Sequence, residues 1–88
     1  MLIFDLGERR HVLIDISNKK TNDFEISHAT YDLIYDDTEE VEESGVCAIS
    51  EHRLDVVLEP KKAGDYLLKV TYKVFDETLI EPIGITVM

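Results

Sequence analysis

Apolar and polar residues alternate with a period of two along most of this chain, and this pattern limits its possible folds more than any other feature. The clearest run covers residues 66–74, where every even position is apolar and three odd positions are Lys or Thr. Successive residues of a strand point to opposite faces, so the apolar set lies on one face of a sheet. Similar runs occupy residues 2–6, 12–16, 31–35, 54–58 and 83–87, and no window has the i, i+3, i+4, i+7 stripe of a helix. The sequence therefore predicts an all-β protein.

Turn-forming residues separate these apolar runs. They occupy residues 7–10, 18–22, 36–40 and 60–64, and Asp76-Glu77 is typical of a short hairpin connection. About seven strands result, with a spacing near the roughly 8–12 residues expected of a β-sandwich or barrel. The 88-residue chain has room for a single domain, residues 1–88.

Two irregularities in the pattern carry structural information. Phe24 and Ile26 have one parity and Ala29 begins a run with the other, which predicts a bulge or bend near His28. Pro82 lies inside the last run and has no N–H to give to a sheet ladder. We therefore expect this strand to be an edge or to change its partner there.

Tyr66 is the most informative of the four tyrosines, which all fall on the inward parity. It follows Ala63-Gly64-Asp65 and begins the strand with the clearest alternation. This position resembles that of the tyrosine in immunoglobulin-like sandwiches whose hydroxyl hydrogen-bonds to the backbone of the preceding connection. Leu68 stands where antibody-type domains carry a cysteine, and the chain has no Trp. The prediction is an immunoglobulin-like antiparallel β-sandwich of about seven strands, without a disulfide.

The formal net charge is -10. Nucleic acids and anionic membranes are bound through Lys and Arg, so the acidic excess argues against both partners. The excess is uneven, with 12 acidic and 4 basic residues in residues 1–44 against 7 and 5 in residues 45–88. A basic protein surface or a cation would be attracted to the first half, and the alternative is that the charge keeps a small β protein soluble and monomeric.

Cys47 is the single cysteine, so no disulfide can form within the chain. Small secreted domains usually carry several, which favours a reducing compartment or assembly inside a cell. Residues 1–5 have no basic segment and no long apolar run, unlike a signal peptide. No stretch approaches the roughly 18 apolar residues of a membrane-spanning helix.

The acidic segment 36–43 holds six carboxylates in eight residues. Calcium prefers several oxygen ligands that converge on one point. The segment lacks the spacing and the glycine of an EF-hand loop, and successive strand residues diverge to opposite faces. We therefore expect a solvated hairpin tip and no metal site.

The residue types used in catalysis show no supporting pattern. His11, His28 and His52 are far apart, and Cys47 lies on the run 46–49, where we expect a half-buried structural thiol. A nucleophilic Cys–His pair would need a third supporting group, and no two glycines are close enough to cradle a phosphate. The sequence predicts no enzyme activity, and no catalytic, cofactor-binding or metal-binding residues.

Five segments between Ala29 and Val87 carry a resemblance to a known family. They are residues 29–36 (ATYDLIYD), Glu43-Ser44-Gly45 before a short strand, Leu58-Glu59-Pro60, residues 63–70 (AGDYLLKV) and residues 83–87 (IGITV). This part, about two-thirds of the chain, resembles small immunoglobulin-like modules of tailed-phage structural proteins, and the nearest type is the N-terminal domain of phage baseplate upper proteins. The resemblance implies no catalytic residues.

The resemblance implies a non-catalytic structural or interaction module of a phage or prophage virion, in the tail, baseplate or head–tail region. Its partners would be proteins, a homo-oligomer stays open, and its location would be the virion or the host cytoplasm during assembly. The long downstream region of a baseplate protein is missing, so we expect a free-standing small virion or accessory protein. Contacts are expected at the terminal strands, residues 1–6 and 78–88, because unpaired edges can accept another strand.

Two alternatives come from other functional classes. The net charge of -10 suits an acidic decoy that mimics nucleic acid and blocks a basic host protein. The acidic segment 36–43 suits a calcium-dependent adhesive domain.

Overall fold

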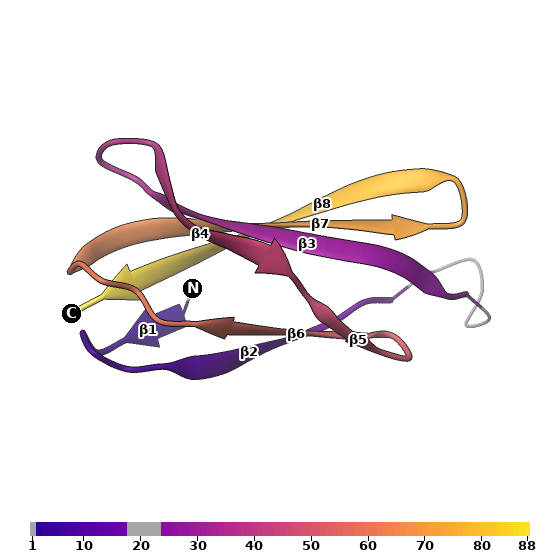
Figure 1. Ribbon diagram of the computed structural model, residues 1–88, viewed down its shortest axis with the longest axis horizontal. Helices are drawn as coiled ribbons and strands as arrows, with labels where there is room; N and C mark the ends of the chain where they lie inside the picture. The colour runs from indigo at the N-terminus through magenta and orange to yellow at the C-terminus, as the bar shows by residue number, and fades with distance from the viewer. Residues whose placement is uncertain (1, 18–23) are drawn as a thin grey trace.

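Two β-sheets make up the computed structural model, which describes residues 2–17 and 24–88 (Figure 1). In chain order the eight strands of these residues are β1 (Leu2–Phe4), β2 (Arg10–Asp15), β3 (Ile26–Tyr35), β4 (Glu40–Val46), β5 (Ala48–Ser50), β6 (Arg53–Leu58), β7 (Gly64–Val74) and β8 (Glu77–Val87). One sheet has the order β1-β8-β7-β3-β4 and the other the order β2-β6-β5. The sheets form two layers over an apolar interior, which confirms the predicted all-β class in a sandwich-like arrangement. The expectation of purely antiparallel sheets is wrong for the five-stranded sheet, because β1 pairs with β8 in parallel.

The long hairpin of β7 and β8 forms the centre of the five-stranded sheet. Its register runs without interruption from Gly64 opposite Val87 to Val74 opposite Glu77. The turn consists of Phe75 and Asp76, one residue earlier than the predicted connection at Asp76-Glu77. Phe75 adopts a positive φ of 56°, which is uncommon for an aromatic residue, so residue type alone did not indicate it as a turn position.

The last strand is paired differently along its length. β7 pairs with all of β8, whereas β1 lies parallel to β8 only where Leu2 to Phe4 face Ile85 to Val87. Along residues 77–84, no strand of the described chain pairs with the other side of β8. Pro82 lies in this edge segment, so the expectation drawn from its missing N–H is confirmed.

Two register shifts interrupt the pairing of β3. One lies between Ile26 and His28 in the pairing with β7, at the position predicted from the change of parity. The other lies in the pairing with β4, where Leu33 faces Glu43 and the next residue faces Val41. Glu42 is the extra residue of this second bulge, which the alternation of β4 did not reveal.

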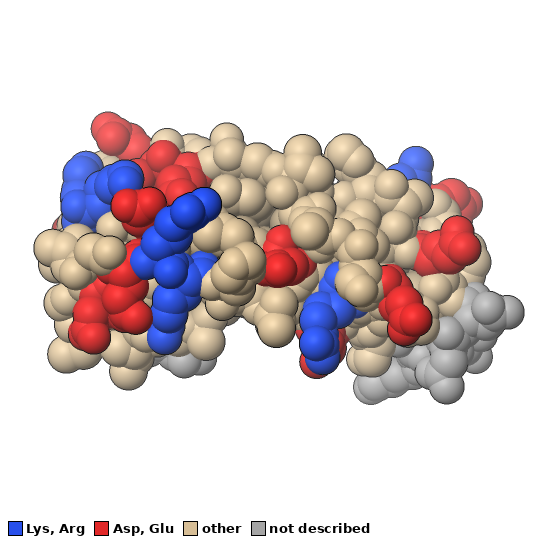
Figure 2. All heavy atoms as spheres, turned by 60° about the horizontal axis from the view of Figure 1, so that its bottom comes forward, with Lys and Arg blue, Asp and Glu red and all other residues tan. Residues whose placement is uncertain are grey.

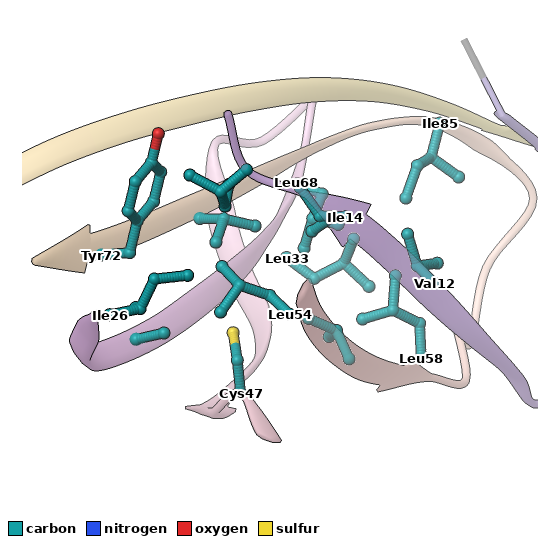
Figure 3. Close-up of a cluster of buried hydrophobic side chains, with 14 of the residues drawn as sticks. Val12, Ile14, Ile26, Leu33, Cys47, Leu54, Leu58, Leu68, Tyr72 and Ile85 are labelled. Carbon is teal, nitrogen blue, oxygen red and sulfur yellow. The ribbon is translucent and has the colours of Figure 1, made fainter. Parts of the chain in front are cut away.

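The core follows the two-residue alternation closely. Every even-numbered residue of β7 from 66 to 74 is buried, and so are Leu54, Val56 and Leu58 of β6. Figure 3 shows side chains of the two sheets pointing toward one another, among them Leu54 and Leu58 of one sheet and Leu68 of the other. Full burial of a Val or Leu side chain stabilises the fold by about 1.5–3 kcal/mol, so the alternating rows hold the two sheets together.

The chain crosses from the first sheet to the second at Cys47. β4 pairs with β3 up to Val46, and β5 pairs with β6 from Ala48 onward, so the expected single run 46–49 is two strands in different sheets (Figure 1). Cys47 N donates to the carbonyl oxygen of Ala29 at 3.0 Å, and its side chain is only 3% exposed. The thiol is therefore buried rather than half-buried. Because of the crossing, the described residues form eight strands instead of about seven.

Other expectations differ at the chain's beginning. The first strand ends at Phe4, and Leu6 is exposed in a turn closed by Glu8 N donating to the carbonyl oxygen of Asp5 at 3.0 Å.

The expected turn at residues 18–22 lies outside the described residues. In the part of the chain that is described, no helix has the length and hydropathy needed to cross a bilayer.

Candidate interaction surface

An open groove separates β2 from β8 along one side of the molecule. It has a volume of about 480 Å³ and is lined by Leu2, Phe4, Val12, Ile14, Glu81 and Ile83, together with other residues of β2. The groove exists because the two sheets differ in width and β1 covers only the last residues of β8. Part of the lining falls in residues 1–6 and 78–88, where the sequence predicted contacts, whereas β2 lies outside those ranges.

Arg10 closes the end of the groove next to β1. Its Nη2 donates to the carbonyl oxygen of Ile3 at 2.6 Å, and its guanidinium lies 4.1 Å from the centre of the Phe4 ring. Nε is also 3.8 Å from a carboxylate oxygen of Glu8. Arg10 thus ties β2 of one sheet to β1 of the other, and the apolar lining beyond this tie stays open.

The charged side chains along the groove differ in whether they are paired. Asp15 Oδ1 is 2.8 Å from Arg53 Nε, and His11 Nδ1 is 2.8 Å from Asp55 Oδ1. Glu81 lies opposite Val70, which places it on the inward-facing row of β8, yet it is exposed. Among the described residues no ion pair includes Glu81, so a negative charge stands free beside an apolar lining.

The acidic segment divides into a solvated tip and an anchored base. Residues 36–40 are exposed, as expected for a hairpin tip. Glu43 Oε2 accepts from Glu59 N at 3.1 Å, and Glu42 Oε2 accepts from Lys61 N at 3.2 Å. The expected solvated hairpin tip is therefore found at residues 36–40 but not at Glu42 and Glu43, which contact the connection between β6 and β7. Glu42 is the extra residue of the bulge in β4.

Tyr66 makes the predicted hydrogen bonds to the preceding connection. Its hydroxyl donates to the carbonyl oxygen of Lys62 and accepts from Lys62 N, both at 3.2 Å. Burial raises the pKa of Tyr66 to about 12, and the neighbouring Glu42 carboxylate is the next cause. The Tyr35 ring packs edge-on at 5.0 Å, and its hydroxyl donates to the carbonyl oxygen of Ala63 at 3.0 Å. Tyr35 and Tyr66 thus hold in place the β6–β7 connection, whose backbone amides also donate to Glu42 and Glu43.

The histidines and the cysteine lie on separate elements. His11 is on β2, His28 is exposed on β3, and His52 stacks on Phe24 with ring centres 3.9 Å apart. Burial raises the pKa of the Cys47 thiol to about 11, which keeps it protonated at neutral pH. Within residues 2–17 and 24–88, no group of three or more His, Cys, Asp or Glu side chains is placed to hold a metal ion.

The charges on the face formed mainly by the three-stranded sheet are mixed in sign. Figure 2 shows acidic and basic side chains interspersed along this face, with uncharged surface between them. The ion pairs of Arg53 with Asp15 and of Lys61 with Glu59 are examples of this mixing. The net charge of -10 therefore does not collect into a single acidic patch on the face in view.

Comparison with known proteins returned no match among family models, curated proteins or solved structures. The functional argument accordingly starts from the geometry of the chain itself. Its most distinctive element is the groove between β2 and β8, which combines free strand edges, apolar lining and an unpaired carboxylate.

Proposed function

We propose that this protein is a non-catalytic interaction module of immunoglobulin-like build, and that it serves as a component of a phage or prophage virion in the tail, baseplate or head–tail region. The strand order supports the first part of this proposal. With β2 to β8 taken as strands B, C, C′, D, E, F and G, one sheet has the order G-F-C-C′ and the other B-E-D. This is the order of an immunoglobulin sandwich in which the first strand has moved from B to G.

Tyr66 supports the same assignment independently of the strand order. In such sandwiches a tyrosine near the start of strand F bonds back to the backbone a few residues upstream. Tyr66 is the third residue of β7 and bonds to Lys62, four residues upstream. The virion assignment itself comes from the resemblance of residues 29–87 to tailed-phage modules.

The observation that carries an interaction role is the groove between β2 and β8. Native proteins usually cover or blunt their strand edges, because unpaired N–H and C=O groups can bind another chain. Here the edge of β8 is free along residues 77–84, and the apolar side chains of Leu79 and Ile80 are exposed on it. A free edge flanked by exposed apolar surface is typical of a protein-binding site.

The assembly role is tested in cells that produce the phage or the induced prophage. Particles and assembly intermediates are purified by gradient sedimentation, and the chain is quantified in each fraction by mass spectrometry. We expect a fixed ratio of this chain to a tail or head–tail protein. A chain that stays at the top of the gradient in every preparation contradicts the virion assignment.

A further inference from the structure

Two free strand edges face the same groove. β2 is an outer strand of the three-stranded sheet, and β8 is unpaired on its outer side along residues 77–84. Residues from both strands line the groove. Since an edge strand directs alternate N–H and C=O groups away from its partner, this opening offers backbone hydrogen bonds to an extended segment.

The side chains in the groove match one face of an added strand. Val12 and Ile14, two residues apart on β2, and Ile83 of β8 supply apolar lining. A segment bound along β2 would place alternate side chains inward, so it needs apolar residues at every second position. β2 has six residues, which corresponds to a segment about 20 Å long.

Charge distinguishes the kind of chain that fits. Glu81 projects from the inward-facing row of β8 and has no ion-pair partner among the described residues. A cationic side chain beside it would form a charge-assisted hydrogen bond. A second copy of this chain also carries a net charge of -10, so electrostatic repulsion between the two copies disfavours self-association at this edge.

We propose that the groove between β2 and β8 binds an extended segment of a partner protein as an added strand along β2, with inward apolar residues and an inward Lys or Arg beside Glu81. This inference rests on the proposed role as an interaction module and names the surface and the occupant. In the strand order given above, the segment occupies the place beside B that the moved first strand leaves empty.

The probe is a synthetic peptide that alternates inward Val with outward Ser or Thr and carries one inward Lys. A matched peptide has Glu in place of the Lys. Hydrogen exchange on the full chain reports the binding mode, because a strand added along β2 protects the amides of β2 that it pairs with. We expect saturable binding of the Lys peptide with protection in β2, and about tenfold weaker binding of the Glu peptide at low salt.

Two variants test the role of Glu81 directly. Glu81→Lys should reverse the preference, so that the Glu peptide binds about tenfold more tightly than the Lys peptide. Glu77→Lys is the control, because it makes the same charge change on the same row of β8 but outside the groove lining. It should keep the original preference. An unchanged preference in Glu81→Lys, or protection elsewhere on the chain, overturns the proposal.

Sedimentation of the unliganded chain separates the remaining outcomes. A dimer that the peptide dissociates would show that a second copy is the occupant, which overturns the partner assignment. Failure of every alternating peptide to bind, in a chain that is found in particles, rejects the groove but leaves the virion role standing. Binding of the peptide by a chain that is absent from particles rejects the virion role but leaves the groove.

Discussion

The hydroxyl of Tyr66 is the residue-scale feature on which the β6–β7 connection depends. Tyr66→Phe removes both hydrogen bonds to Lys62 and leaves partly buried backbone groups without a partner. We expect a loss of about 1–3 kcal/mol in the free energy of unfolding, measured by denaturant titration. Tyr72→Phe is the control, since Tyr72 is also buried but its hydroxyl makes no hydrogen bond within the described residues. Equal midpoints for the two variants would contradict the prediction.

The raised pKa of Tyr66 makes stability depend on pH at the alkaline end. The folded-state pKa is about 12, and the unfolded value is near its ordinary value of about 10. The unfolded chain therefore loses this proton first, so the stabilisation is complete below pH ~10 and is lost as the pH rises toward 12. Between these limits unfolding free energy should fall by up to about 1.4 kcal/mol per pH unit because of this group.

The measurement compares the wild type with Tyr66→Phe at several pH values between 9 and 12. Burial also raises the pKa values of Tyr72 and Cys47, so the wild-type slope contains other groups. The difference between the two proteins isolates Tyr66. Parallel curves for the two would show that Tyr66 ionises equally well in the folded and unfolded states.

Cys47 should be almost inert in the folded protein. Its side chain is 3% exposed and its pKa is about 11, so both access and the thiolate form are suppressed. We expect alkylation at pH 8 to be at least about a hundredfold slower in buffer than in denaturant. A control thiol comes from Val46→Cys in a Cys47→Ala chain, because Val46 is 73% exposed and adjacent. Equal rates for the two thiols would show that Cys47 is not buried.

At the scale of elements, the alternation of apolar and polar residues predicts which side chains of a strand are buried, because the pleat of the strand alone decides this. β6 and β7 carry their buried rows where the sequence places them, and the bulge near His28 follows from a change of parity. The crossing at Cys47 could not be predicted, because residues 46–49 contain no turn-forming residue and the change of sheet depends on tertiary pairing. The anchoring of Glu42 needs the bulge opposite β3, which depends on the partner strand.

The sequence did not predict the groove itself, only contacts at the terminal strands that form part of its lining. Unpaired terminal strands indicated residues 1–6 and 78–88, and Pro82 indicated an edge. The contribution of β2 follows from the unequal widths of the sheets, which no local pattern encodes. The free state of Glu81 likewise depends on which side chains lie near it in space.

The start of β7 requires a glycine. Gly64 has a φ of 132°, and a Cβ there would lie 2.9 Å from the Tyr35 hydroxyl oxygen. Gly64→Ala should therefore cost about 1–3 kcal/mol of unfolding free energy and displace Tyr35 from its hydrogen bond to Ala63. Gly84→Ala is the matched change, with no atom within 4 Å of its Cβ, and should be neutral or slightly stabilising. Thermal unfolding of both variants decides, and a smaller loss in Gly64→Ala contradicts the argument.

At the scale of the whole molecule, the charge of -10 raises the question of whether it acts as a recognition surface or as a solubilising one. An acidic decoy needs free carboxylates gathered on one surface. Glu42 and Glu43 bind backbone amides, and the face in Figure 2 mixes both signs. The exposed tip, which includes Glu39 and Glu40, is therefore the acidic segment left for such a role.

The double variant Glu39→Gln, Glu40→Gln distinguishes a recognition role of the acidic tip from a solubilising one. It leaves the hydrogen bonds of Glu42 and Glu43 in place. Both substituted side chains are exposed, so the free energy of unfolding should change by less than about 0.5 kcal/mol. If partners bind at the groove between β2 and β8, this double variant should enter particles as the wild type does, while Glu81→Lys should not. Quantitative mass spectrometry of purified particles makes the comparison. Loss of the double variant from particles, with its stability intact, would place recognition at the acidic tip, because only free charge has been removed there.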